Sequence, residues 1–322
     1  MSRSGTKKPL RVKLIFNPTA GKAGESPQQL MEILTEMQKH NMQPEVHVWD
    51  GEAGMKAVIK RALKDGTRLI VASGGDGTID SLAAELAGSP LTLGILPTGT
   101  ANNLAINLRI PRRLDEAVAL LRQGRRVKID LGYARSGGTK RFFLEMATLG
   151  LISDIFPPAD DFRRGEILKA GEVISTIAAS TPSLVTLEIG QKKPVSLSAY
   201  SVVVANMPYI GRNFRINRSV SFRDGLLNVF VFTELSKVGL LNYAIRYLGG
   251  EINDESVKHF RVRRVKITTL PQMGVNADGR QLPASQIRIR VQPEALRVMA
   301  NTSNGTGPRR SEVPELIKVE HG

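Results

Sequence analysis

The sequence predicts two domains: an N-terminal α/β domain built on a doubly wound parallel sheet, and a C-terminal antiparallel β-sandwich. Over residues 1–128, short apolar runs alternate with amphipathic helical patterns, which is typical of a parallel sheet with helices on both faces. Over residues 129–299, runs with a period of two residues predominate. Such runs indicate antiparallel strands that turn one face toward a core.

The first domain is predicted from its apolar runs, each of which has the length of one strand. Strands are expected at residues 11–17, 45–49, 68–72 and 91–96, with helices at 27–39, 53–63 and 79–86. In the helix at 27–39, Leu30, Ile33 and Met37 recur on one face, and Ser26 is the expected N-cap. Strand and helix therefore alternate through this half of the chain.

The second domain is predicted from alternating patterns. Strands are expected at 141–148, 184–189, 196–206, 227–233, 261–269 and 286–292, and helices at 163–179 and 236–248. Near residue 127 the apolar Ile129 and Leu131 alternate with Asp130 and Gly132, which indicates a strand with one polar face. The last segment, 300–322, is polar and is predicted either to be mobile or to pack back on the first domain.

Composition excludes several classes of chemistry. The chain has no cysteine, and its four histidines show no metal-ligand spacing. No apolar run has the roughly 20 residues that span a bilayer, and the N-terminus does not resemble a signal peptide, so a cytoplasmic protein is expected. The net charge of +15 predicts attraction to polyanions, although any single basic cluster also reads as a solvated surface.

Three polar, glycine-bearing loops follow predicted strands, at residues 17–21, 74–78 and 99–103. Ligands of open parallel sheets bind at the carboxyl ends of the strands. The shared position of these loops predicts one composite site.

The loop at 74–78 has the composition of a phosphate-binding turn. Gly74, Gly75 and Gly77 permit positive φ and leave room for an anion beside backbone amides, and the helix that follows directs its N-terminus at that anion. Asp76 is placed either to bind magnesium, directly or through water, or to accept a proton from an attacking hydroxyl. Thr78 is expected either to cap the helix or to touch a phosphate. The alternative is a tight turn with an incidental aspartate.

The loop at 99–103 offers hydrogen-bonding groups suited to a nucleotide. Gly99 supplies flexibility, and Thr100 and Asn102 supply a hydroxyl and an amide for phosphate or ribose. The alternative is that Thr100 and Asn102 cap the next helix.

Taken together, these motifs resemble the diacylglycerol kinase catalytic family, which includes soluble bacterial diacylglycerol kinases and the related sphingosine and ceramide kinases. The resemblance spans Val12 to about Met299. It is carried, in matching order and spacing, by residues 16–21, 74–78, 93–103, Asn206 with 208–211, 224–227, and Asp278-Gly279 before Pro283.

The resemblance implies a lipid kinase that uses ATP and Mg²⁺ to phosphorylate an alcohol of diacylglycerol or a similar lipid. It implies nucleotide contacts at Asn17, Pro18, Gly74, Gly75, Gly77, Thr78, Gly99, Thr100 and Asn102. Asp76 becomes a catalytic and metal-binding residue and Asp278 a candidate general base, while Asp224 is a candidate ligand of a structural metal ion. Phosphoryl transfer needs aligned reactants, a charge clamp on the phosphates and a proton acceptor.

Four departures from the family pattern bear on activity. Asp80-Ser81 stands where the family has Asn-Glu, Asn103 where it often has Asp, Asn228 where it has Asp, and Arg280 where it has Glu. Asn103 is a variant that also occurs in the family. The others replace acidic groups, which favours weaker magnesium binding, a different acceptor lipid or a poorly active protein.

The expected partner is a lipid substrate at an anionic membrane surface. The predicted helix at 163–179 mixes apolar and basic residues, which suits such an interface, although it equally suits an ordinary helix over the sandwich. The alternatives are an inactive nucleotide- or lipid-binding protein, an NAD-kinase-type enzyme and a nucleic-acid module. No recognition motif supports specific nucleic-acid binding. A homodimer is compatible with the sequence, which does not fix the oligomeric state.

Overall fold

The computed structural model describes residues 8–20, 26–99, 102–155, 175–177, 179–210, 214–215, 217, 219–233, 257–283 and 286–301. The chain divides into two compact units. The first contains the described residues up to Ile129 together with those from Ala295 onward, and the second contains the described residues from Asp130 to Glu294. Among the described residues, no helix is both long and apolar enough to cross a membrane.

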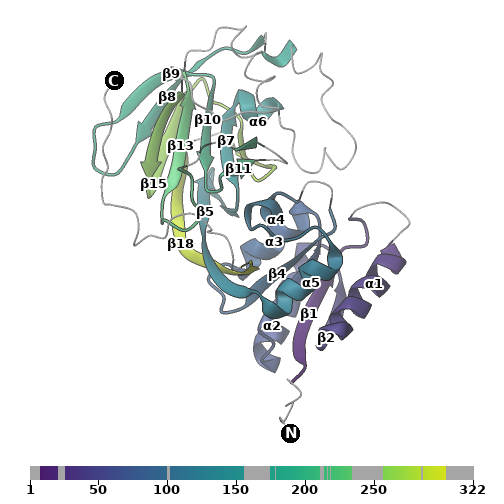
Figure 1. Ribbon diagram of the computed structural model, residues 1–322. Coiled ribbons are helices and arrows are strands. Elements are labelled where there is room, and N and C mark those ends of the chain that lie inside the picture. The colour runs from purple at the N-terminus through teal and green to yellow at the C-terminus, as the bar shows by residue number, and fades with distance from the viewer. Residues whose placement is uncertain are drawn as a thin grey trace. The chain divides into compact units, whose positions relative to one another are not determined.

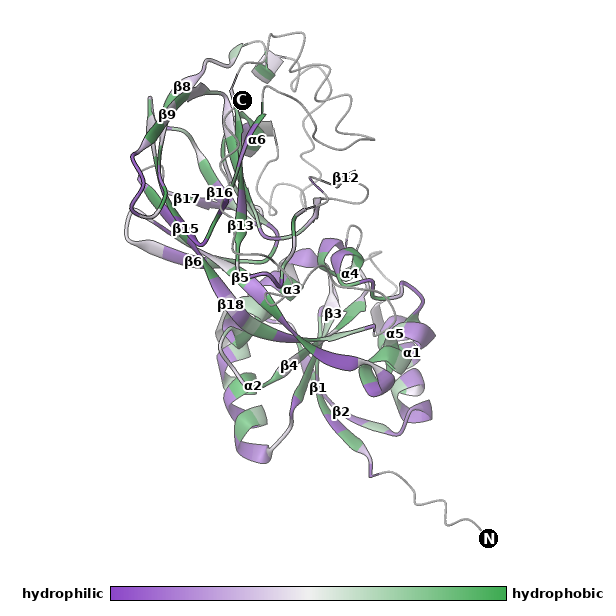
Figure 2. Ribbon diagram, turned by 60° about the vertical axis from the view of Figure 1, so that its left-hand side comes forward, coloured by the Kyte–Doolittle hydropathy of each residue, from purple (hydrophilic) through white to green (hydrophobic). Residues whose placement is uncertain are grey.

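The first unit is a doubly wound α/β domain, as predicted (Figure 1). Its elements are β1 (Leu10–Phe16), α1 (Ser26–Lys39), β2 (Met42–Val48), α2 (Glu52–Asp65), β3 (Leu69–Gly74), α3 (Asp76–Leu86), β4 (Thr92–Pro97), α4 (Asn103–Asn107) and α5 (Leu114–Gln123). The strands pair in parallel in the order β2-β1-β3-β4. Helices α1 and α5 cover one face of this sheet, and α2 and α3 cover the other (Figure 2).

Burial explains why the central strands read as continuous apolar runs. All six residues of β3 are buried, because helices cover the sheet on both faces. The end of β18 (Ile287–Ala300) also belongs to this unit, where Arg297 and Val298 pair in parallel with Thr92 and Leu93 of β4. The predicted strand at 286–292 is therefore longer than its period-two pattern indicated.

The second unit is a β-sandwich, which confirms the predicted fold class. Its other elements are β5 (Arg125–Ser136), which begins in the first unit, β6 (Thr139–Phe143), β7 (Met146–Gly150), α6 (Leu151–Ile155), β8 (Ser183–Glu188), β9 (Val195–Ala199), β10 (Ser201–Ala205), β11 (Tyr209–Ile210), β12 (Phe214–Arg215), β13 (Leu227–Phe232), β14 (Val257–Val262), β15 (Arg264–Leu270), β16 (Val275–Ala277) and β17 (Arg280–Leu282). One sheet has the order β18-β15-β8-β9, with β5 beside β18 and β6 beside β5; the other has the order β14-β13-β10-β7-β16-β17. Alternate residues of the two sheets form a common apolar core.

Three predicted strands are each divided in the structure. The run at 141–148 forms β6 and β7, with a break at Leu144 and Glu145 whose amides bond to a side chain rather than to a neighbouring strand. The runs at 196–206 and 261–269 break at Tyr200 and Arg263. A break of one or two residues leaves the pattern of apolar residues nearly unchanged, so periodicity alone does not reveal it.

The alternating pattern near residue 127 does not match the observed burial. Asp130 alternates with the apolar Ile129 and Leu131, but all three residues are buried, and Asp130 is only 2% exposed. The predicted helix at 236–248, most of that at 163–179 and the tail beyond Asn301 lie outside the described residues.

Candidate active site in the α/β unit

The turn between β3 and α3 differs in detail from its prediction. Helix α3 begins at Asp76 rather than at residue 79, with Gly75 as its N-cap at φ −89° and no side-chain cap. Thr78 is therefore inside the first turn and is not the cap. Gly74, Gly75 and Gly77 all lack positive φ, so the predicted conformational role of these glycines is wrong.

Two glycines of these loops, Gly74 and Gly99, are required because other atoms of the protein lie too close to leave room for a side chain, and not because of their φ. A Cβ added to Gly99 would lie 2.4 Å from the Cα of Gly75 and 3.1 Å from its nitrogen. At Gly74, an added Cβ would lie 2.8 Å from the Cβ of the buried Thr78. The loops after β3 and β4 thus meet backbone to backbone.

Asp76 links these two loops electrostatically. Its carboxylate accepts hydrogen bonds from the backbone amides of Asn102, at 3.0 Å, and Asn103, at 2.6 Å. It therefore caps α4 from another segment of the chain. Burial raises the pKa of Asp76, while these amide donors lower it.

Asn102 occupies the N-cap position of α4 but does not cap with its side chain. Its backbone is left-handed, with φ 56° and ψ 46°. Its side chain instead holds its own loop, because Oδ1 accepts from the amide of Gly99 at 3.1 Å and Nδ2 donates to the carbonyls of Gly99 and Pro97. Thr100, the other predicted cap or ligand, lies outside the described residues.

The loop after β1 joins the same cluster. Asn17 is 5% exposed, and its Nδ2 donates to Oγ1 of Thr78 at 2.7 Å. Its Oδ1 accepts from the amide and hydroxyl of Thr19, and the half-buried Pro18 lies between them in the chain. The prediction that the three loops lie together is confirmed, and Asn17 ties the first loop to the first turn of α3.

Asp278 lies in the second unit, at the turn of the β16–β17 hairpin. Asp278 and Gly279 both have positive φ, 45° and 71°, and they stand between the paired residues Ala277 and Arg280. This is a two-residue turn of type I′, for which Asp-Gly is a strong sequence signal. The sequence interpretation used the dipeptide only as a family motif and missed the hairpin.

The Asp278 carboxylate fills the break between β6 and β7. It accepts hydrogen bonds from the amides of Leu144, Glu145 and Met146, the last two at 3.1 and 3.0 Å. Burial raises the pKa of Asp278 to about 6, although these amides and Arg141 act in the opposite direction. The three backbone amides therefore fix the carboxyl in place.

Asp224 bonds to groups of the protein itself. Its buried side chain accepts from Arg261 at 2.8 Å and from the amide of Leu226 at 3.0 Å. Within the described ranges, no three Asp, Glu or His side chains gather as metal ligands. A guanidinium group thus stands beside the carboxylate that was predicted as a metal ligand.

Asp130 and Asn206 form a second buried polar cluster. Asp130 accepts from the amides of Gly225, at 2.7 Å, and Glu294, at 2.8 Å. The fully buried Asn206 donates to the carbonyls of Asp130 and Leu144. Sequence reasoning assigned no role to Asp130; an acidic residue between the apolar Ile129 and Leu131 was the signal available.

Comparison with known proteins supports the resemblance seen in the motifs. Residues 11–134 match the diacylglycerol kinase catalytic domain, and residues 161–300 match the YegS C-terminal NAD kinase beta sandwich-like domain. The chain belongs to the diacylglycerol kinase catalytic-domain family. The first match contains the three loops joined around Asp76, and the second contains Asp224 and Asp278.

Relatives of this family member align along most of their length. Bacillus subtilis diacylglycerol kinase is 25% identical over 84% of this chain and 89% of its own. A Pectobacterium atrosepticum protein named "Probable lipid kinase YegS-like" is 28% identical over 90% and 95%. A crystal structure of a diacylglycerol kinase from Bacillus anthracis superposes with a TM-score of 0.70 at 23% identity, covering 92% of this chain and 98% of that one, which supports the fold.

Proposed function

We propose that this kinase-family protein transfers the γ-phosphoryl group of ATP to the hydroxyl of diacylglycerol or a similar lipid alcohol at a membrane surface. The observation that carries the proposal is the backbone contact between Gly75 and Gly99, which joins two loops of the matched catalytic domain around Asp76. A site formed from backbone rather than from side chains suits a polyphosphate, whose oxygens accept hydrogen bonds from amides.

The start of α3 suits the nucleotide phosphates. This helix has 11 residues, begins at Asp76 and carries no side-chain cap, so its first amides and its dipole favour an anion. Gly75 adds no side chain at that position. Asn17, Thr78 and Asn102 hold the loops through hydrogen bonds, and Gly74 and Gly99 hold them through close packing, so all five are positioning residues in this proposal. Gly75 and Gly77 supply the approach to ATP.

Asp76 is the residue that would hold Mg²⁺. Magnesium usually takes one or two carboxylates together with the phosphates of the substrate, so one carboxylate beside the phosphate loop fits this ion. The Asp76 oxygens accept hydrogen bonds from the amides of Asn102 and Asn103, and a carboxylate oxygen that accepts such a bond can also be a ligand of a cation. When bound, the ion would neutralise charge on the phosphates.

Transfer forms a bond between the lipid oxygen and the γ-phosphorus, and it breaks the bond from that phosphorus to the oxygen of the departing ADP. The hydroxyl proton goes to a carboxylate. Asp278 is the proposed acceptor, because burial raises its pKa to about 6 and an effective general base titrates near the working pH.

A second candidate function is that of a nucleotide- or lipid-binding protein with impaired catalysis. Asn228, where the family pattern has Asp, is fully buried and its Oδ1 lies 2.9 Å from Nε2 of His259. The family acid at this position is therefore replaced by a neutral group with a partner of its own, which favours an altered site.

The deciding experiment is transfer of labelled γ-phosphate from ATP to a panel of lipids in mixed micelles with Mg²⁺ and anionic lipid. Wild type is expected to yield a labelled lipid, and Asp76→Asn to lose at least about 100-fold in rate. Asp115→Asn, which removes an exposed carboxylate of α5 that pairs with Arg113, is the matched control. ATP binding with no labelled product across the panel would refute the kinase and favour the impaired protein.

A further inference from the structure

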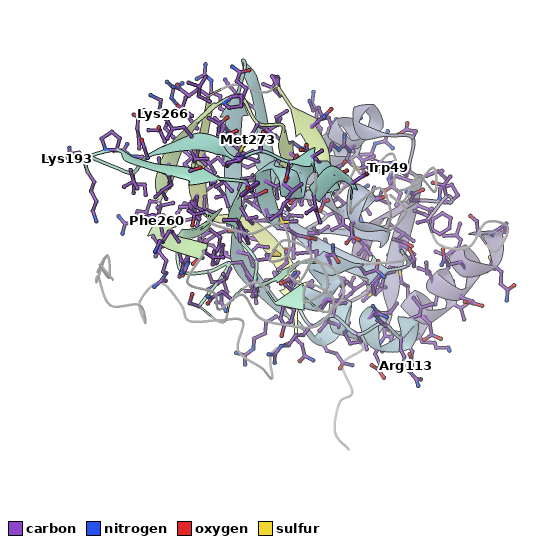
Figure 3. The ribbon with its side chains drawn as sticks, turned by 90° about the horizontal axis from the view of Figure 1, so that it is seen from above. Trp49, Arg113, Lys193, Phe260, Lys266 and Met273 are labelled. Carbon is purple, nitrogen blue, oxygen red and sulfur yellow. The ribbon has the colours of Figure 1, made fainter. Side chains whose placement is uncertain are left out.

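One sheet of the second unit carries a concentrated group of positive charges on the side away from the core. We call this the outer sheet face: the side chains of β5, β6, β18, β15, β8 and β9 that alternate with core residues, as far as Gln292 of β18. Its cations are Arg135, Lys140, Arg264, Lys266, Arg288 and Arg290. Lys266 lies at the periphery of the side chains in Figure 3, and the exposed Lys193 of the β8–β9 turn projects away from the ribbon in the same view.

The strand register sets these cations directly against one another. Arg264 pairs with Arg290 and Lys266 with Arg288. Arg135 pairs with Lys140 on the neighbouring strands.

Like charges directly opposite one another destabilise an antiparallel pair. Three such pairs on one face oppose folding, so the requirements of the sheet itself do not account for them. The Glu188 carboxylate offsets part of this charge, through its ion pair with Lys266 at 2.6 Å. A ligand that carries many negative charges would satisfy the remainder.

Apolar and aromatic groups border the same charges. Leu184 and Leu270 are partners across β8 and β15, and they are 50% and 72% exposed. Arg290 lies over the Tyr133 ring at 5.0 Å, and Phe142 meets that ring edge-on at 5.0 Å between ring centroids. A basic surface with exposed leucines and half-buried aromatics is suited to the boundary between lipid headgroups and acyl chains.

We propose that the outer sheet face docks this protein onto an anionic lipid bilayer, with Leu184 and Leu270 entering the headgroup layer. The inference rests on the proposed lipid kinase function, because the acceptor alcohol resides in that bilayer. A second copy of the chain does not fit face to face, since its cations would meet cations. A nucleic acid would satisfy the charges but would leave the paired leucines in water.

The test is flotation with vesicles of phosphatidylcholine alone and of phosphatidylcholine with phosphatidylglycerol, at low and high salt. Wild type is expected to bind only the anionic vesicles, and added salt is expected to weaken that binding. Arg264→Gln with Arg288→Gln is expected to weaken it roughly 25-fold, at about fivefold for each cation removed. This variant also relieves two like-charge pairs, so it should fold at least as stably as wild type.

A matched variant separates the outer sheet face from the net charge of the chain. Lys60→Gln with Lys64→Gln removes two exposed positive charges from α2 in the other unit and is expected to change vesicle binding less than about threefold. An equal loss in the two variants would overturn the proposal. Leu184→Ser with Leu270→Ser is expected to abolish the binding that survives at high salt, and retention of that binding would remove the leucines from the interface.

Two further outcomes distinguish the inference from the function on which it rests. With a short-chain diacylglycerol dispersed in water, the Arg264→Gln, Arg288→Gln variant should phosphorylate the lipid as wild type does. Vesicle binding that depends on this face, in a protein that phosphorylates no lipid, would refute the kinase and leave the docking surface. Binding of duplex DNA but not of anionic vesicles would overturn the docking proposal in favour of nucleic acid.

Discussion

The contact between Gly75 and Gly99 leads to a quantitative test of the site. In Gly99→Ala the new methyl carbon would lie 2.4 Å from the Cα of Gly75 and 2.9 Å from Oδ1 of Asn102. Ordinary contacts of a Cβ begin near 3.4 Å, so the two loops must separate by about an ångström at the point where Asp76 joins them. Overpacking of this kind destabilises by about 1–3 kcal/mol, and ATP affinity should fall as the loops part.

Gly75→Ala is the matched variant, because its new carbon would approach only the Cα of Gly99, at 3.5 Å. Its φ of −89° is ordinary for alanine, so the expected loss is about 1 kcal/mol or less, from exchanging glycine for alanine at a helix N-cap. Its ATP affinity should nevertheless fall, because the methyl group enters the proposed phosphate site. Urea unfolding and calorimetric titration with ATP measure both quantities. Equal stability of the two variants would show that the loops are not in backbone contact.

Three other sites give further predictions. Asp278→Asn should retain the type I′ turn, because Asn-Gly suits it, but should lower kcat far more than ATP affinity, as measured by steady-state kinetics and titration. The folded-state pKa of Asp278, about 6, exceeds its ordinary value near 4. The free energy of unfolding of wild type should therefore fall, relative to that of Asp278→Asn, as the pH rises from about 4 to about 6. Parallel pH profiles of the two proteins would contradict this. Lys13→Met removes the buried ammonium group that lies 2.6 Å from the Asp65 carboxylate. It should reduce the free energy of unfolding by about 1–3 kcal/mol. This loss is smaller than for a fully buried ion pair, because Asp65 reaches water. In Gly132→Ala the added Cβ would lie 2.0 Å from the Phe143 ring, so this variant should unfold with about 1–3 kcal/mol less free energy than wild type. Phe143→Leu should restore part of this loss in the double variant. If the two single-variant losses simply add, that contact is absent.

The position of the site followed from the sequence, while its internal connections did not. Alternation of strands and helices places the three loops at one edge of the sheet, and that prediction is confirmed by the bonds from Asn17 to Thr78 and from Asp76 to Asn102. Which group caps α4 depends on a contact across 26 residues of chain. Local capping rules favoured Asn102 itself, because they consider only neighbours in sequence.

The sandwich shows the same limit. Its inward residues were identified from their period of two, yet the breaks at Leu144, Tyr200 and Arg263 were not. At Leu144 the ladder ends because the amide meets the Asp278 carboxylate, 134 residues away in the chain. The alternating pattern puts Asp130 on the strand face opposite Ile129 and Leu131, where a charged side chain is usually solvated. Here the amides of Gly225 and Glu294 donate to the carboxylate in place of water, which offsets part of the cost of burying it.

The two contacts of Asp76 change how any loss of activity in its variants must be interpreted. A carboxylate that accepts two amide hydrogen bonds stabilises its loops, and charge-assisted bonds of this kind contribute about 1.5–3 kcal/mol each. Asp76→Asn presents an NH₂ group to one of those amides, so α4 and the Gly99 loop would loosen even if no metal ever bound. Asp76→Glu keeps the charge but displaces it by one methylene. If Asp76 acts only by capping, the losses of activity should follow the losses of stability across both variants. If it also binds magnesium, Asp76→Asn should lose far more activity than its stability explains, and raising the Mg²⁺ concentration should restore part of the rate to Asp76→Glu alone.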